Sequence, residues 1–420
     1  MAQGASTRGW IVTLAGLGIN LALGVLYSWS IIGKALSAEW GWSAGQTSLP
    51  YATAVGVFAI AMVFAGRAQD RFGPRIVATI GGVLTGAGLI VASFASADNA
   101  LPLILGFGLL AGSGIGLGYA SATPAAVKWF PPARKGLITG LVVSGFGLAS
   151  VYIAPMTTSL LHTYGIETTL RMLGVVFLVA VVAFAQLLVN PPAGYVPATP
   201  LTTASSTKSK AARPELDWRE MVRTKQFALL WFMYAFSAFA GLMIIGHMAK
   251  IAVAQLPGID LGFGLVAVLA IGNASGRIAA GMASDRLGET RTMFFVFVAQ
   301  AAMMATIAFA KTPLSLIPVA AGIGFCYGAN LSLFPSATAG FFGTKHLGVN
   351  YGLVFTAWGV GGVFGSMTAG TIVDSTGSYA VAYGVAAVLC LLAAGTTFIT
   401  KAPDPLAIPV ALKPRKSKAA

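Results

Sequence analysis

Long runs of apolar residues are the main feature of the chain, and charged or glycine- and proline-containing turns separate them. A helix that crosses a bilayer needs roughly 20 mainly apolar residues, because each residue advances about 1.5 Å through about 30 Å of hydrocarbon. Runs of this length predict helices near 10–33, 46–66, 74–96, 101–127, 136–160, 168–190, 226–251, 261–284, 290–310, 313–340, 348–374 and 378–400.

The composition places these helices in a membrane. The chain has 56% hydrophobic and 9% charged residues and a mean hydropathy of +0.81, whereas soluble proteins carry about 25% charged residues. Helices suit a bilayer because each one satisfies its own backbone hydrogen bonds. We therefore expect an all-α membrane protein with twelve transmembrane helices.

A short basic pattern occurs twice, about half the length of the 420-residue chain apart. In both copies it follows an apolar helix and ends in a glycine-rich turn. The first copy contains Gly66, Asp70, Arg71, Gly73 and Arg75, and the second contains Gly281, Asp285, Arg286, Gly288 and Arg291. The repeat predicts two related halves, a six-helix bundle over 1–190 and another over 226–400.

The polar segments outside the bundles have different characters. Residues 191–225 begin as a linker rich in Pro, Ser and Thr. Asp217 and Glu220 then have the spacing of a capping box, which predicts a short surface helix from Trp218 to Arg223, with a plain loop as the alternative. Residues 401–420 form a basic tail.

The distribution of the net charge of +14 along the chain indicates the topology of the protein in the membrane. Most of the 26 Lys and Arg residues fall in segments on the side that both termini share. By the positive-inside rule that side is cytoplasmic, so we expect a multi-pass protein of the cell (inner) membrane with both termini in the cytoplasm. The partner that this charge implies is the lipid bilayer, and we expect no nucleic-acid binding.

Arg277 is the one basic residue that clearly lies inside a predicted helix. It precedes Asp285 by eight residues, or roughly 12 Å of helix. An arginine at the centre of a membrane helix costs about 2.5–3.5 kcal/mol on insertion scales, which makes it a candidate functional residue. We place no Asp or Glu in the middle of a helix, so a carboxylate brought by a ligand is the expected partner. The alternative is an arginine that binds backbone carbonyls or extends towards the cytoplasm.

Two stretches match a known signature. GRAQDRFGPR fits the pattern G-x-x-x-D-R-x-G-x-R of the major facilitator superfamily, and GMASDRLGETR fits its second copy with one extra residue. The stretches LDWREMVRTKQFALLWFMY and NYGLVFTAWGVGG resemble the oxalate/formate antiporter branch, which is akin to the monocarboxylate transporters.

This resemblance implies a fold of two six-helix bundles around a central cavity. It also implies a cytoplasmic gate made by the two repeated loops. In that gate the carboxylates would lie near the positive N-terminal ends of helices eleven and five. The gate residues implied in this way are Asp70, Arg71, Asp285 and Arg286.

Asn273 lies four residues before Arg277 and so shares its helix face. Monocarboxylate transporters have an Asp at this position that is thought to take part in proton coupling, and an Asn cannot carry a proton. The proton would then travel with the anion itself, a water or His247. His247 is expected in the outer half of its helix, where a hydrogen-bonded or gate histidine is an equal alternative.

Trp358 occupies the position where oxalate carriers of this branch have a Lys. One Arg balances one carboxylate, so a small monocarboxylate such as lactate or pyruvate is favoured over the dianion oxalate. Hydroxyl groups and an apolar wall complete the predicted site, although such side chains are also common in plain packing. The hydroxyls belong to Tyr27, Tyr119 and Tyr327, and the wall to Leu26, Phe355 and Trp358.

The sequence favours a carrier over the other classes of protein. No nucleophile with a base, carboxylate pair or metal-ligand cluster is evident, so we expect no enzyme, cofactor or metal. We predict alternating-access transport of a monocarboxylate, with proton symport and a functional monomer. The alternatives are an anion exchanger of the oxalate/formate type and a membrane sensor that binds an anion without moving it.

Overall fold

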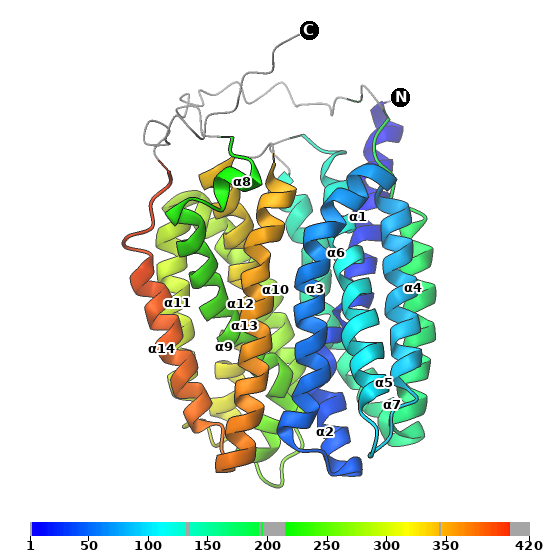
Figure 1. The fold of residues 1–420 in the computed structure, drawn as a ribbon, viewed down its shortest axis with the longest axis vertical. Helices are drawn as coiled ribbons and strands as arrows, with labels where there is room; N and C mark the ends of the chain where they lie inside the picture. Colours follow the sequence, from blue (N-terminus) through cyan, green and yellow to red (C-terminus); the bar gives the residue numbers. More distant parts are fainter. Residues whose placement is uncertain (1, 132–134, 193–194, 196–214, 344–345, 404–420) are drawn as a thin grey trace.

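The computed structural model of the protein describes residues 2–131, 135–192, 195, 215–343 and 346–403, and their regular structure is almost entirely helical (Figure 1). The first half contains α1 (Ala2–Leu23), the 3-10 segment η1 (Gly24–Ser28), α2 (Trp29–Trp40), α3 (Ala44–Phe72), α4 (Pro74–Ala92), α5 (Leu101–Leu103), the π-helical η2 (Ile104–Ala111), α6 (Gly112–Val127) and α7 (Lys135–Ala185). The second half contains α8 (Trp218–Met221), α9 (Lys225–Gln255), α10 (Gly262–Leu287), α11 (Glu289–Ile307), α12 (Pro313–Phe342), α13 (Leu347–Thr376) and α14 (Ala380–Thr396).

The helices account for twelve membrane crossings. Ten helical segments of the described chain are long and apolar enough to span a bilayer. One of them, α7, has 51 residues, or about 77 Å of helix, and is broken at Gly165, where φ is 72°. It therefore supplies two crossings, and the 17-residue apolar helix α14, about 26 Å long, supplies the last. The predicted loop between helices five and six is reduced to this single glycine.

The first crossing differs from the predicted continuous helix over 10–33. It extends from Ala2 to Trp40 and is interrupted by η1. A 3-10 turn is tighter than an α-turn, so it changes the direction of the side chains that follow. Helix α7 packs very closely against the first residue of η1, Gly24: a Cβ on Gly24 would lie 2.1 Å from the Cβ of Ala149 in α7. All five residues of η1 are buried, including Leu26 and Tyr27.

The helices form two groups, with α1–α7 on one side of Figure 1 and α9–α14 on the other. The groups meet mainly where α3 packs on α13 and α7 packs on α10. Small residues allow this approach: a Cβ on Gly359 of α13 would lie 2.3 Å from the Cβ of Ala59 on α3. The domain boundaries at 190 and 226 stay a prediction.

The segment before α9 begins with the expected capping box. The Asp217 carboxylate accepts hydrogen bonds from the backbone N–H groups of Arg219 and Glu220, and the Glu220 carboxylate accepts one from the N–H of Asp217. The helix ends at Met221, two residues before the predicted Arg223. Most of the predicted linker and most of the basic tail lie outside the described residues.

Candidate functional site

Arg277 is buried in α10 where this helix faces α7 of the other half. Its side chain is 3% exposed. Its Nη1 donates a hydrogen bond of 2.7 Å to the carbonyl oxygen of Val143 in α7, and its Nε donates one of 3.1 Å to Oδ1 of Asn273. The alternative interpretation of Arg277 expected it to bind backbone carbonyls, and the bond to Val143 agrees with that in part. The same bond links the two halves of the molecule.

Two buried donors beside these bonds have no acceptor. Nη2 of Arg277 and Nδ2 of Asn273 are both enclosed by the protein and have no hydrogen-bond partner among the residues that the structure describes. Among the side chains that the structure describes, no carboxylate pairs with Arg277. The ion pair found among these side chains joins Lys34 and Asp260 elsewhere in the molecule. An unpaired buried donor costs about 1–3 kcal/mol, and more when it is charged. The pair of free donors is therefore suited to a carboxylate that comes from outside.

Two of the predicted tyrosines connect the halves through a hydrogen bond. The hydroxyl groups of Tyr27 in η1 and Tyr327 in α12 are 2.8 Å apart. The indole N–H of Trp358 in α13 donates to the same Tyr327 oxygen at 2.8 Å. The Tyr27 hydroxyl also lies near the side chains of Asn273 and Arg277, and the Tyr119 hydroxyl lies near Arg277, but neither reaches hydrogen-bond geometry with the free donors. The structure thus places two of the predicted hydroxyl groups near the arginine, and the third, that of Tyr327, on Tyr27.

The predicted apolar wall forms one aromatic cluster. The rings of Phe355 and Trp358 stack with centroids 4.8 Å apart, and Phe355 also stacks on Tyr119 at 6.4 Å. Leu26 is fully buried in η1, next to Tyr27. All of these side chains are buried, so none of them is open to solvent in the conformation described.

Sequence reasoning missed several members of this cluster, of which Phe58 and Phe146 make the most ring contacts. Phe58 of α3 contacts the rings of Tyr119, Phe146, Phe355 and Trp358, at centroid distances of 5.0–5.9 Å. Phe146 of α7 packs edge-on against Tyr27 at 4.9 Å and against Tyr119 at 5.3 Å. A Phe in an apolar helix carries no sequence signal that separates it from ordinary core residues.

His247 lies in a separate cluster. Its Nε2 is 3.1 Å from Oγ of Ser48 and 3.2 Å from the carbonyl oxygen of Ser366, and its Nδ1 is 3.1 Å from the hydroxyl of Tyr379. The side chain is 2% exposed. Both ring nitrogens therefore have partners, as expected for a histidine that holds helices together, and its role in proton coupling stays a prediction.

The predicted cytoplasmic gate is only partly described. The side chains of Asp70 and Asp285 lie outside the described residues. Arg71 and Arg286 are exposed in the last turns of α3 and α10, and the Arg71 guanidinium lies 5.3 Å from the centre of the Phe72 ring. The gate stays a prediction.

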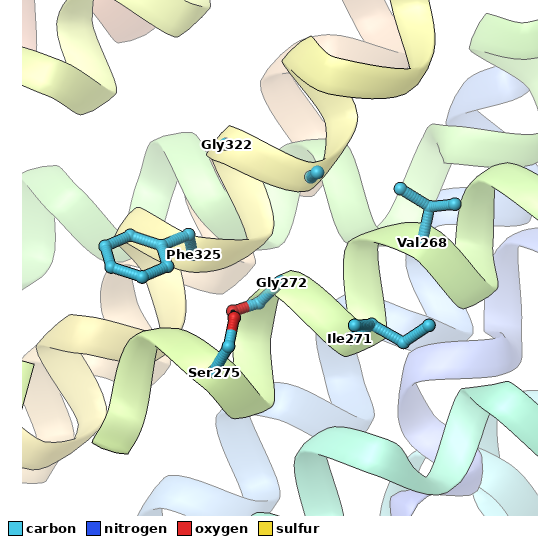
Figure 2. Close-up of a pocket in the computed structure, with 7 residues that line it drawn as sticks. Val268, Ile271, Gly272, Ser275, Gly322 and Phe325 are labelled. Atoms are coloured by element: carbon cyan, nitrogen blue, oxygen red, sulfur yellow. The ribbon is translucent and has the colours of Figure 1, made fainter. Parts of the chain in front are cut away.

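A pocket on the opposite face of α10 does not resemble an anion site. It lies between α10 and α12, and Figure 2 shows Ser275 as the only labelled lining residue with a polar side chain. The Ser275 hydroxyl donates to the carbonyl of Gly272, and Ile271 and Phe325 are 54% and 37% exposed. No cation lines this groove, so the candidate site remains the one around Arg277.

Comparisons with known proteins agree with this arrangement. The family profile of the Major Facilitator Superfamily matches residues 10–279 and 256–419. An uncharacterized MFS-type transporter, YhjX, of Escherichia coli is 32% identical over 84% of this chain and 86% of its own. The oxalate:formate antiporter of Oxalobacter formigenes is 27% identical over 88% and 86% of the two chains, and mouse monocarboxylate transporter 11 is 29% identical over 89% and 83%.

The matches extend over both halves and most of each relative, and they concern transport proteins, not enzymes. The twelve crossings fit the same conclusion. The chain therefore belongs to the Major Facilitator Superfamily, as a multi-pass membrane transporter of the branch that includes the monocarboxylate transporters and the oxalate:formate antiporter.

Proposed function

We propose that the protein carries a small monocarboxylate, of the size of lactate or pyruvate, by alternating access between its two halves. The observation that carries this proposal is the pair of buried, unpaired donors, Nη2 of Arg277 and Nδ2 of Asn273. A carboxylate has two oxygens in one plane and can accept from both groups. The cargo would supply the negative charge that this centre lacks.

The size and charge of the cargo follow from the surroundings of the arginine. One guanidinium balances one carboxylate, and a second negative charge in this buried space would cost several kcal/mol. The position where oxalate carriers have a Lys holds Trp358, whose indole N–H is used by Tyr327. The stacked rings of Phe355 and Trp358 would line a short apolar tail once the halves separate.

The proposed cycle moves the two halves around this centre. The hydrogen bonds from Arg277 to Val143 and between Tyr27 and Tyr327 both join the first half to the second. We propose that the cargo carboxylate competes for these donors when it binds, and that opening on either side breaks the contacts between the halves. The protein would act as a monomer in the cell (inner) membrane, with both termini in the cytoplasm.

We further propose symport with a proton. No described carboxylate lies at the Arg277 centre to carry the proton, which leaves the cargo itself, a water or His247. Exchange of two anions is the second candidate, because the oxalate:formate antiporter is among the relatives. Symport predicts net uptake that an inward proton gradient drives, whereas obligate exchange predicts uptake only into vesicles that already contain an anion.

The test is uptake of labelled lactate into proteoliposomes, with and without an inward proton gradient. We expect saturable uptake, stimulation by the gradient and counterflow from preloaded vesicles. Arg277→Lys keeps the charge but loses the planar fork, so uptake should fall by about tenfold or more. Binding without any uptake would instead indicate a sensor, and uptake that does not depend on Arg277 would overturn the proposed site.

A further inference from the structure

The first turn of α3 is held by a carboxylate from the other half of the molecule. The backbone N–H groups of Ala44 and Gly45 donate to the two carboxylate oxygens of Asp374, at 2.8 and 2.7 Å. Asp374 lies near the end of α13. The hydroxyl of Ser43 accepts from the next N–H group, that of Gln46. The N–H of Ser43 in turn donates to Oε1 of Gln46. All four amides that a helix leaves unpaired at its start therefore have partners, two of them across the interface between the halves.

This contact is closely fitted. A Cβ on Gly45 would lie 2.8 Å from Oδ2 of Asp374, and a Cβ on Gly370 would lie 2.9 Å from the carbonyl oxygen of Ala44. The backbones of α3 and α13 thus cross without room for any larger side chain. The positive end of the α3 dipole also favours a carboxylate at this place.

Two further side chains of the second half bind the same turns of α3. Nζ of Lys250 in α9 donates to the hydroxyl of Thr47, and Nε2 of His247 pairs with the hydroxyl of Ser48. The cluster lies at the end of the bundle opposite α8, where α3 begins and α13 ends, which we call the outer end (Figure 1). Separation of the halves at the outer end requires that these contacts break.

We propose that Asp374 is a latch that keeps the outer end of the carrier closed. It is a positioning residue: it caps α3 from the opposite half, and its release frees α3 to move away from α13. The latch does not depend on which anion is carried.

The test measures access to the interface beneath the latch. Ser366 is buried in α13, and its hydroxyl has no hydrogen-bond partner, so Ser366→Cys provides a reporter thiol. In proteoliposomes, a membrane-impermeant maleimide added at the outer end should label this thiol about fivefold faster or more when Asp374→Asn is also present. Gly45→Ala disturbs the same contact from the other half without a change of charge and should act in the same direction.

Two controls separate a latch from general loosening. Lys34→Gln removes an exposed ion pair with Asp260 between the two halves and should change the rate by less than about twofold. A thiol introduced by Ser237→Cys, buried within the second half, should stay protected in all variants. The latch is overturned if the Ser366→Cys thiol is labelled at the same rate with and without Asp374→Asn or Gly45→Ala. It is also overturned if the thiol at position 237 gains as much as the one at position 366. Either result would stand even if lactate transport is established.

Discussion

The Arg277 centre and the His247 cluster are both buried polar groups at the interface between the halves, and they differ in how completely they are paired. At the centre, Nη2 of Arg277 and Nδ2 of Asn273 have no acceptor. In the His247 cluster, both ring nitrogens have partners within 3.2 Å. The first arrangement leaves two donors available for the proposed ligand, whereas the ring nitrogens of His247 are already paired.

This difference separates binding from closure. Buried hydroxyls such as that of Ser366 also lack a partner among the described residues, but a charged donor costs more to leave unpaired than a neutral one. The free Nη2 of Arg277 is therefore the position that best suits a group arriving later. A fully paired histidine instead stabilises the closed arrangement of α9, α3 and α13. Substitutions at the centre should therefore change cargo affinity and selectivity, and substitutions in the outer cluster should change the rate of opening.

The largest change in selectivity is expected for Trp358→Lys. A second buried cation would compensate the second charge of a dianion, and a close charge pair contributes about 2–5 kcal/mol. The ratio of oxalate to lactate affinity should rise by about 30-fold or more, measured by competition with labelled lactate. Trp358→Phe removes the indole without adding charge and should keep the preference for lactate. If the Trp358→Lys variant still prefers lactate, the proposed role of Trp358 in selectivity is contradicted.

Asn273→Asp should give Arg277 a carboxylate partner from the protein itself. Its carboxylate would pair with the Nε of Arg277, so lactate affinity at neutral pH should fall by about tenfold. Acidification would protonate this carboxylate and free the guanidinium, so the affinity should recover as the pH falls. Binding measured over a range of pH tests this, with Asn273→Ser as the neutral control. An affinity loss that is independent of pH would contradict the proposed competition.

His247→Gln should reduce turnover by about fivefold, because it destabilises the closed outer end to which the carrier must return in each cycle, while the KM for lactate stays within about twofold. The substitution weakens neutral hydrogen bonds to Ser48 and Tyr379 but leaves the Arg277 centre unchanged. Initial rates over a range of lactate concentrations separate the two constants. If KM rises while turnover is unchanged, the distinction between the two regions fails.

The smallest effect is expected for Tyr27→Phe. It removes one neutral hydrogen bond between the halves, which contributes about 0.5–1.5 kcal/mol, so uptake should change by about threefold. Tyr327→Phe should have a larger effect, because it also leaves the indole N–H of Trp358 without an acceptor. The reverse order of the two variants would contradict the arrangement of the three side chains.

Much of the fold follows from the sequence because the bilayer requires long apolar helices. The hydrophobic runs predict the twelve crossings, and the Asp217–Glu220 spacing predicts a capping box that the structure contains. The breaks inside crossings are less predictable. A single glycine, Gly165, replaces the expected loop in α7, and η1 interrupts the first crossing, because packing against α7 overrides the uniform local preference for helix.

The candidate site was predictable where it depends on rare residue types. A lone arginine within an apolar helix is conspicuous, and Asn273 follows from helical spacing. The acceptor that Arg277 uses in the other half, the carbonyl of Val143, could not be predicted, since every residue has a carbonyl. The same holds for the cap that Asp374 places on α3, which depends on a contact between residues about 330 positions apart.

The most direct test of the central claim is equilibrium binding of labelled lactate to the purified protein and to Arg277→Gln. Gln keeps a polar side chain but removes the charge and the fork. The wild-type protein should bind one lactate per chain, and Arg277→Gln should bind at least about 100-fold more weakly, because it removes one partner of a buried charge pair. Equal affinity of the two proteins would contradict the claim that Arg277 receives the carboxylate.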